Sequence, residues 1–225
     1  MKKEFQIISE LIEEEKRVLD VGCGDGILMK HLKENKNVDT RGLEISKKNV
    51  QICVSKGLSV IEGNAEKDLQ QFPNSSFDYV ILSQTLQAFY KPEKVIDDLL
   101  RVANKAIVTI PNFGYWKVRL NLLFKGTMPV TKNLPNEWYD TPNLHMCTIK
   151  DFVNFCNKKN INLFKSIALH EEKVSMITKH LPNEWYNTPN LHMCTIKDFV
   201  NFCSKKNINF FLDTKIEKIF NCAHM

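Results

Sequence analysis

A short glycine-rich loop is the part of the sequence best suited to hold a ligand. The stretch LDVGCGDG, Leu19 to Gly26, lies between a β-rich apolar run and a helical pattern, so it is expected to lead from a strand into a helix. A dinucleotide fingerprint would need a further glycine at position 27, where this chain has isoleucine. Asp20 and Asp25 add negative charge beside Gly22, Gly24 and Gly26. A cationic or amine-bearing ligand is therefore expected rather than a pyrophosphate.

An acid in the next apolar run fits the same class of ligand. Glu44 lies near the end of RGLEI, Arg41 to Ile45, which is the strand expected after the glycine loop. An α/β nucleotide site places a carboxylate here, where it accepts hydrogen bonds from both ribose hydroxyls. The glycine set and the acid together predict a nucleoside-containing ligand. The alternative is a nucleotide-type fold that binds nothing.

Polar side chains also follow the later strands. IEGNAEKDL brings Asn64 and Ala65 in directly after the third expected strand. LSQTLQ places Ser83, Gln84 and Gln87 where the fourth strand ends, the edge at which open α/β sheets bind ligands. An ordinary role in a loop or at a helix start is the alternative for these last three residues.

The elements around these residues alternate between strand and helix patterns. An amphipathic helix is expected over 4–14, and a later helix is expected to begin at Thr148, with Asp151 as its capping-box partner. Expected strands are 17–21, 41–45, 58–62, 77–83, 105–110 and 163–169, with helices at 46–56 and 93–102. Buried-looking strands that alternate with helices predict an α/β fold with a doubly wound, mostly parallel, Rossmann-like sheet and helices on both faces.

The glycine loop and Glu44 resemble the class I S-adenosylmethionine (SAM) dependent methyltransferase fold. From Arg17 to Leu169 the chain is also similar to the methionine-biosynthesis MetW family, through RVLDVGCGDG, RGLEIS, FDYVILSQTLQ, IPNFGYWKVRLNLL and MPVTKNLPNEWYDTPNLHMCTIKDF. The last two pieces are specific to that family. The resemblance implies SAM as cofactor, with Asn64 where the superfamily usually has an acid that contacts the adenine amino group. The implied cofactor-binding residues are Asp20, Gly22, Gly24, Asp25, Gly26, Glu44, Ile45, Asn64, Ala65, Ser83 and Gln84.

The MetW resemblance implies a place in methionine biosynthesis together with a homoserine O-acyltransferase of the MetX type. The chain contains no GxSxG nucleophile elbow, so any acyl transfer would need that partner. SAM sensing would fit such a pathway. The alternatives are a self-sufficient SAM-dependent methyltransferase acting on a small molecule, and a noncatalytic scaffold with a vestigial site.

Residues 111–147 break the alternation of strands and helices. They are rich in aromatic residues, proline and asparagine, and they are too long for a simple connection, so a lid that faces the substrate is expected. A packed irregular connector is the alternative. The catalytic candidates in this lid are His145, Tyr139 and Asp140 for proton transfer and Arg119 as a carboxylate clamp. Capping or packing is the alternative role for His145.

Composition excludes several other classes of protein. The 225 residues carry a formal net charge of +5, and the lysines are scattered in pairs, which disfavours nucleic-acid binding. The seven cysteines show no CxxC spacing, so neither a metal site nor a disulfide framework is expected. No export signal and no apolar run of membrane-spanning length occurs, so the expected location is the cytoplasm.

A long segment of the chain occurs twice. Residues 131–162 return as 178–209 with 29 of 32 positions identical. Two copies are too few for a solenoid, which indicates a recent duplication or a sequence-assembly error. We therefore expect a methyltransferase-like domain at 1–170 with its lid at 111–147, followed by an atypical duplicated extension at 171–225. Only one strand candidate follows each copy.

Overall fold

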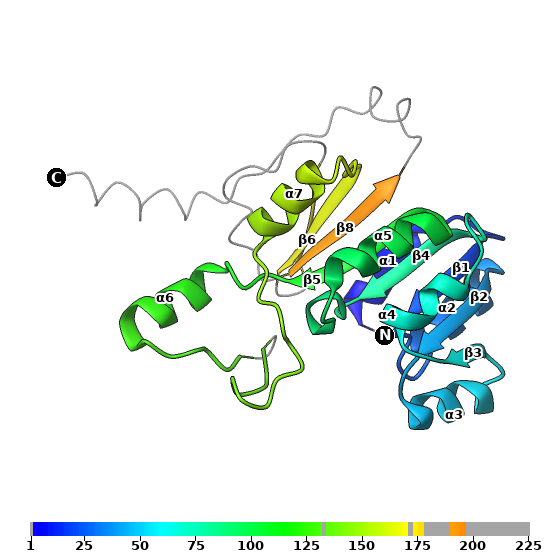
Figure 1. The fold of residues 1–225 in the computed structure, drawn as a ribbon, viewed down its shortest axis with the longest axis horizontal. Coiled ribbons are helices and arrows are strands. Elements are labelled where there is room, and N and C mark those ends of the chain that lie inside the picture. Colours follow the sequence, from blue (N-terminus) through cyan, green and yellow to red (C-terminus); the bar gives the residue numbers. More distant parts are fainter. Residues whose placement is uncertain (1, 132–133, 171–172, 178–189, 197–225) are drawn as a thin grey trace.

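The computed structural model describes residues 2–131, 134–170, 173–177 and 190–196. It has an α/β fold, which confirms the predicted class (Figure 1). The strands are β1 (Arg17–Val21), β2 (Asp39–Glu44), β3 (Ser59–Glu62), β4 (Phe77–Ser83), β5 (Ala103–Pro111), β6 (Lys165–His170), β7 (Lys173–Ile177) and β8 (Asn190–Ile196). The helices are α1 (Lys3–Leu11), α2 (Ile27–Lys36), α3 (Lys47–Ser55), α4 (Ala65–Asp68), η1 (Leu69–Gln71), η2 (Leu86–Ala88), α5 (Pro92–Val102), α6 (Trp116–Lys125) and α7 (Ile149–Lys158).

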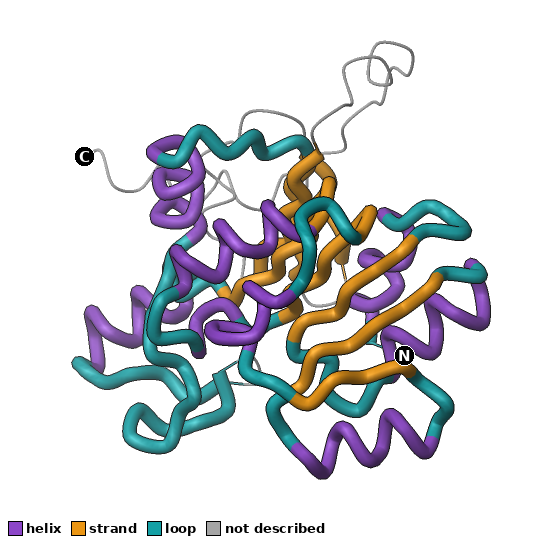
Figure 2. Tube along the Cα trace, turned by 45° about the vertical axis from the view of Figure 1, so that its right-hand side comes forward, coloured by secondary structure: helices purple, strands orange, loops and turns teal. Residues whose placement is uncertain are grey.

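The strands form one continuous sheet, drawn in orange in Figure 2. Their order is β3-β2-β1-β4-β5-β8-β6-β7. The first five strands pair in parallel, whereas β8 pairs antiparallel with both β5 and β6. The chain moves outward from β1 in one direction and then returns to β4 on its other side. This reversal between β1 and β4 is the topological switch point at which open α/β sheets bind ligands.

Helices cover both faces of the sheet, because each strand near the centre is apolar on both sides. On one face, α5 and α7 pack over strand residues such as Val80 and Val108, and Figure 1 shows both helices in front of the strands. On the other face, Ile8 of α1 and Ile12, the C-cap residue of that helix, join Ile81 in a second cluster, to which α2 also contributes. Between these two layers of helices, the parallel strands β1, β2 and β4 end at the same edge of the sheet.

The predicted lid contains an element that the sequence pattern did not indicate. Helix α6 extends away from the sheet in Figure 1, and several of its large apolar side chains, including Leu123 and Phe124, are exposed. The lid rejoins the fold at α7, where Thr148 accepts a hydrogen bond from the Asp151 N–H and the Asp151 carboxylate accepts one from the Thr148 N–H. The predicted capping box is therefore confirmed.

The two copies of the repeat differ in structure where both are described. Residues 143–149 of the first copy form a loop that ends at the start of α7, whereas the identical sequence at 190–196 of the second copy forms β8. Strands β7 and β8 follow the expected boundary at residue 170 and nevertheless belong to the same sheet. The strand candidate after the second copy lies outside the described residues. Tertiary pairing with β5 and β6, rather than local sequence, gives this segment its strand conformation.

In the part of the chain that the structure describes, no helix has both the length and the apolar character needed to cross a membrane.

Candidate functional site

The predicted cofactor residues gather at the carboxyl edge of the sheet. Asp20 of β1 lies between Gly42 of β2 and Ile81 of β4 in the parallel register. Two residues after Ile81, Ser83 ends β4, and it therefore lies on the same face of the sheet as Ile81. The switch point thus brings together the ends of three strands whose residues lie far apart in the sequence.

The glycine loop adopts a conformation that explains its composition. Gly22, Gly24 and Gly26 all have positive φ angles, of 72°, 58° and 74°, a region that other residues rarely enter. A Cβ atom on Gly26 would lie 2.5 Å from Leu58 and 2.8 Å from Cys53, whereas a Cβ atom on Gly24 would meet nothing within 4 Å. Gly26 therefore serves close packing of the loop on the fold, and Gly24 leaves open space beside the loop.

Glu44 fixes the loop from the neighbouring strand. Its side chain is only 6% exposed, and its two oxygens accept hydrogen bonds from the Gly24 N–H at 2.8 Å and the Ser46 N–H at 2.9 Å. Each carboxylate oxygen has a second lone pair. The same carboxylate can therefore hold the loop and still accept further hydrogen bonds from a ligand.

Asp20 is the most strongly perturbed acid of the site. It is 3% exposed, and burial, followed by the nearby charge of Glu44, raises the pKa of its carboxyl group to about 7. A buried carboxylate beside a second acid is unfavourable without a cation. A positively charged ligand beside Asp20 would therefore relieve both causes of the shift.

Some of the predicted cofactor residues near the ends of β2 and β3 already make contacts within the protein. The Asn64 side-chain oxygen accepts a hydrogen bond from the Glu66 N–H at 2.9 Å and caps α4, so this oxygen already has one donor. Ala65 is buried directly after it. Ile45 is 67% exposed beyond the end of β2, where an apolar ligand group could cover it. Asp25 lies at the rim of the loop and pairs with Lys56 at 3.7 Å.

The β4 end contains a residue that the sequence analysis did not single out. Glu4 of α1 accepts hydrogen bonds from the Ser83 hydroxyl at 2.8 Å and from the Gln84 side chain at 3.5 Å. The only signal in the sequence is its spacing, because Glu4 lies about one helical turn before Ile8 on the buried face of α1.

The lid candidates do not form one constellation. Arg119 lies on α6, and Tyr139, Asp140 and His145 lie on the loop that follows; all four are exposed. The backbone N–H of His145 donates to the Gln87 carbonyl oxygen at 3.0 Å. The ring Nε2 of His145 lies 3.4 Å from the Tyr90 carbonyl oxygen. His145 therefore attaches the end of the lid to the turn after β4. The catalytic roles of the four residues stay predictions.

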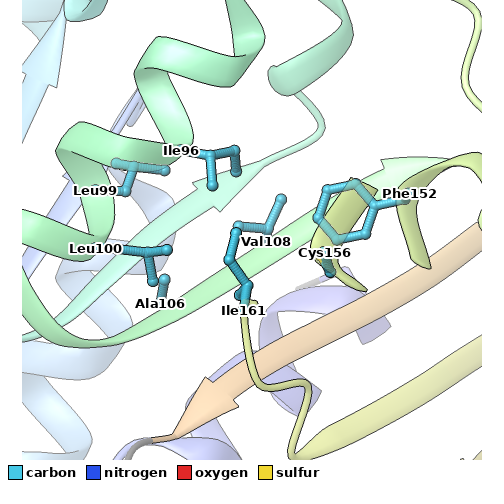
Figure 3. A pocket seen from close by; sticks show the side chains of 8 residues that line it. All are labelled: Ile96, Leu99, Leu100, Ala106, Val108, Phe152, Cys156 and Ile161. Atoms are coloured by element: carbon cyan, nitrogen blue, oxygen red, sulfur yellow. The ribbon is translucent and has the colours of Figure 1, made fainter. Parts of the chain in front are cut away.

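Two cavities have linings that contain no residue of the glycine loop. One, of about 10 Å³, has a wholly apolar lining from α5, β5 and α7 and from Ile161 (Figure 3). It is about the size of a single water molecule, so it is a packing gap of the core. The other, of about 290 Å³, lies beside β2, β3 and η1 and is lined by Leu43, Ile61, Glu62, Asp68, Gln71 and Phe72. Within the described ranges, no group of His, Cys, Asp and Glu side chains could hold a metal ion.

Solved structures with this fold include SAM-dependent methyltransferases. A protein from Thermotoga maritima, described as a SAM-dependent methyltransferase and possible histamine N-methyltransferase, superposes with a TM-score of 0.63 at 17% identity. The match covers 87% of this chain and 88% of that one. At this identity the likeness shows the fold, which is the class I SAM methyltransferase type predicted from the glycine loop.

Two curated relatives match parts of the sequence. The bifunctional methionine biosynthesis protein MetXA/MetW of Rhodopirellula baltica is 30% identical over 163 residues, which are 68% of this chain and 26% of the relative. The chain thus spans about a quarter of that protein. Ajmaline N-methyltransferase of Rauvolfia serpentina is 28% identical over 96 residues, which are 39% of this chain and 32% of the relative.

The family comparison covers the domain and also the repeat. The sequence model of the family described as "Methionine biosynthesis protein MetW" matches residues 2–177, and it matches again over residues 171–219. The second match contains the whole second copy, residues 178–209. With the family-specific lid sequence and the methyltransferase-type fold, these matches identify the chain as a member of the MetW family of methionine biosynthesis proteins.

Proposed function

We propose that this MetW protein binds SAM at the glycine loop and acts in methionine biosynthesis together with a homoserine O-acyltransferase. The observation that carries the SAM proposal is the open space beside Gly24, whose N–H is held at 2.8 Å by the buried carboxylate of Glu44. A side chain at Gly24 would enter this space, so the glycine leaves room for a ligand against the loop.

The residues around this cradle fit the parts of SAM. Asp20 would lie beside the cationic methionine part, and Glu44 would receive the ribose hydroxyls through its remaining lone pairs. Ile45, Asn64 and Ala65 would line the adenine side. SAM, when bound, supplies a methyl group activated by its sulfonium. The chain itself binds and orients the cofactor, and Asp20 supplies negative charge for its cationic part.

Replacing Glu44 with alanine tests this site. Glu44→Ala is expected to weaken SAM binding at least about 100-fold, because two hydrogen bonds to a charged group contribute roughly 1.5–3 kcal/mol each. Isothermal titration calorimetry measures the change. Glu62→Gln is the matched control, since Glu62 pairs with Glu44 in the register of β3 but is exposed. Equal SAM affinity in wild type and Glu44→Ala would contradict the assignment.

The partner proposal is supported by the composition of the relative from Rhodopirellula baltica. Its name combines MetXA with MetW in one protein, and this chain spans 26% of it. Two activities joined in one polypeptide are held at high effective concentration. Because this chain lacks a GxSxG elbow, the nucleophile for acyl transfer would come from the partner.

Adding this chain to a purified MetX-type acyltransferase from the same genome is expected to raise the rate of O-acylhomoserine formation severalfold. The chain alone is expected to give no product, because it has no acyl-transfer nucleophile. The acylated product is measured by chromatography, and co-purification of the two chains is measured in parallel. An acyltransferase that neither binds this chain nor changes its rate would rule out the partnership.

A second candidate function is methyl transfer to a small molecule without a partner. The match to ajmaline N-methyltransferase and the exposed lid with Tyr139, Asp140 and His145 favour it. Labelled SAM incubated with a metabolite extract distinguishes the two functions. Transfer of label by the wild type, lost in Glu44→Ala, would support this second function.

A further inference from the structure

Glu4 occupies an unusual position on the first helix. Glu4 and Ile8 are four residues apart, so they lie along the same face of α1, and Ile12 is the C-cap residue of that helix. Ile8 and Ile12 pack fully buried against the sheet, whereas Glu4 is only partly buried. The charged residue therefore continues an apolar stripe and reaches the carboxyl edge of β4 and β5.

The hydrogen bonds that Glu4 accepts from the described residues all come from neutral donors. One oxygen, Oε1, accepts hydrogen bonds from the Thr109 hydroxyl at 2.7 Å, the Ser83 hydroxyl at 2.8 Å and the Gln84 Nε2 at 3.5 Å. Among the ion pairs of the described residues, none involves Glu4. Among the described residues, this partly buried carboxylate therefore has no counter-charge, and its other oxygen, Oε2, accepts none of these hydrogen bonds.

The turn after β4 provides two further observations. Gln84 has a positive φ of 52°, a conformation that is costly for a residue with a side chain and is frequent at functional sites. Gln87 is 7% exposed, and its Nε2 donates to the Gln84 carbonyl oxygen at 2.7 Å. Its Oε1 is buried with no hydrogen-bond partner among the residues that the structure describes. Burying an acceptor without a donor is unfavourable unless a ligand supplies one.

We propose that Glu4 and the β4 turn, residues 83–87, bind the ammonium group of an amino-acid ligand. An ammonium group has one positive charge and three N–H donors. It would supply the counter-charge that Glu4 lacks among the described residues, and Gln87 Oε1 is a further acceptor in the same turn. Ser83 and Thr109 are register partners of β4 and β5, so the site lies on the opposite side of β4 from Asp20 of β1.

This inference rests on SAM binding at the glycine loop. The ammonium group could belong to SAM itself, through its methionine part, or to a free amino acid that binds beside SAM. Both sources share one chemistry, and different ligands separate them. 5′-Methylthioadenosine contains the nucleoside of SAM but lacks the amino-acid part, so Glu4 should not contribute to its binding.

Glu4→Gln tests the site. Glutamine keeps a carbonyl oxygen for Ser83 and Thr109, so α1 stays attached, but the negative charge is lost. Calorimetry compares SAM with 5′-methylthioadenosine, and thermal shift assays compare the free L-amino acids, homoserine included, with SAM present. The variant is expected to lose at least about tenfold in affinity for SAM or for one amino acid that stabilises the wild type. Its affinity for 5′-methylthioadenosine is expected to stay unchanged.

The matched control is Glu10→Gln, which makes the same change at an exposed position of α1. If Glu4 has only a structural role, Glu4→Gln will lower the melting temperature and weaken SAM and 5′-methylthioadenosine equally. That result, or unchanged responses to SAM and to every amino acid, overturns the inference and leaves SAM binding intact. If the wild type does not bind SAM, the proposed function is rejected instead. The free L-amino acids are then compared without SAM, and a thermal shift that is lost in Glu4→Gln would still support the Glu4 site, whereas equal shifts in both proteins would overturn it.

Discussion

Three glycine-to-alanine substitutions are expected to separate ligand binding from folding. Gly24→Ala is expected to fold with a loss of about 1–2 kcal/mol, the cost of placing a Cβ atom in the left-handed region. Its SAM affinity is expected to fall at least about tenfold, because the new methyl group enters the open space beside the loop. Chemical denaturation and calorimetry measure the two effects.

Gly26→Ala and Gly57→Ala are the comparisons for Gly24→Ala. Gly26→Ala has the same backbone strain, but its Cβ atom would lie 2.5 Å from Leu58 and 2.8 Å from Cys53. Overpacking adds about 1–3 kcal/mol, so this variant is expected to lose the most stability. Gly57, after α3, has a φ of 70°, and no atom lies within 4 Å of its Cβ position, so a methyl group there would not touch the loop.

Gly57→Ala therefore isolates the cost of backbone strain and should leave SAM affinity unchanged. If Gly24→Ala and Gly57→Ala bind SAM equally well, the space beside Gly24 is not the cofactor cradle. If Gly26→Ala is as stable as Gly57→Ala, Leu58 and Cys53 move aside at little cost and Gly26 is not needed for packing.

Much of the fold could be predicted because the central strands carry their own signal. The apolar run at 77–83 coincides with β4, and the capping box at Thr148 gives the start of α7. Helix α6 was missed because its apolar residues do not form one buried stripe; Leu123 and Phe124 are 74% and 78% exposed. Strand β8 could not be predicted, since the same seven residues form a loop and a helix start in the first copy.

Part of the candidate site could also be predicted from the sequence, and part could not. The glycine loop and Glu44 are predictable because strand, loop and acid follow at a spacing that the switch point imposes. Glu4 is not, because its contact with Ser83 joins residues 79 positions apart, and the helix pattern around it predicts only an amphipathic surface helix. Residues such as Glu4, which supply hydrogen-bond acceptors to the site, are brought there by tertiary packing. They therefore form no short sequence motif.

Replacing Asp20 with asparagine is expected to change how stability depends on pH. Burial raises the pKa of Asp20 from an ordinary value of 3.8 to about 7 in the folded protein. Between these values the folded state binds more protons than the unfolded state, so the free energy of unfolding falls as pH rises. The loss is complete above about pH 7 and is on the order of 4 kcal/mol at most. Asparagine stays neutral and avoids this loss.

Asp20→Asn is therefore expected to melt at a higher temperature than wild type at pH 8, whereas the two should differ little near pH 4. Thermal denaturation across this range measures the effect. Asp39→Asn, at an exposed position at the start of β2, is the control and should follow the wild-type curve. A constant difference between Asp20→Asn and wild type at every pH would mean that Asp20 has an ordinary pKa.

The same ionisation links Asp20 to SAM. If the cationic methionine part of SAM lies beside Asp20, binding favours the carboxylate and releases a proton below about pH 7. Wild-type affinity should then rise with pH up to about 7 and level off above it, while Asp20→Asn should bind more weakly at pH 8 and show little dependence on pH. Calorimetry in buffers of different ionisation enthalpy measures the proton directly. If Asp20→Asn is more stable than the wild type and binds SAM more weakly, Asp20 is retained for the ligand rather than for the fold. The buried charge of Asp20 is favourable only when a cation lies against it.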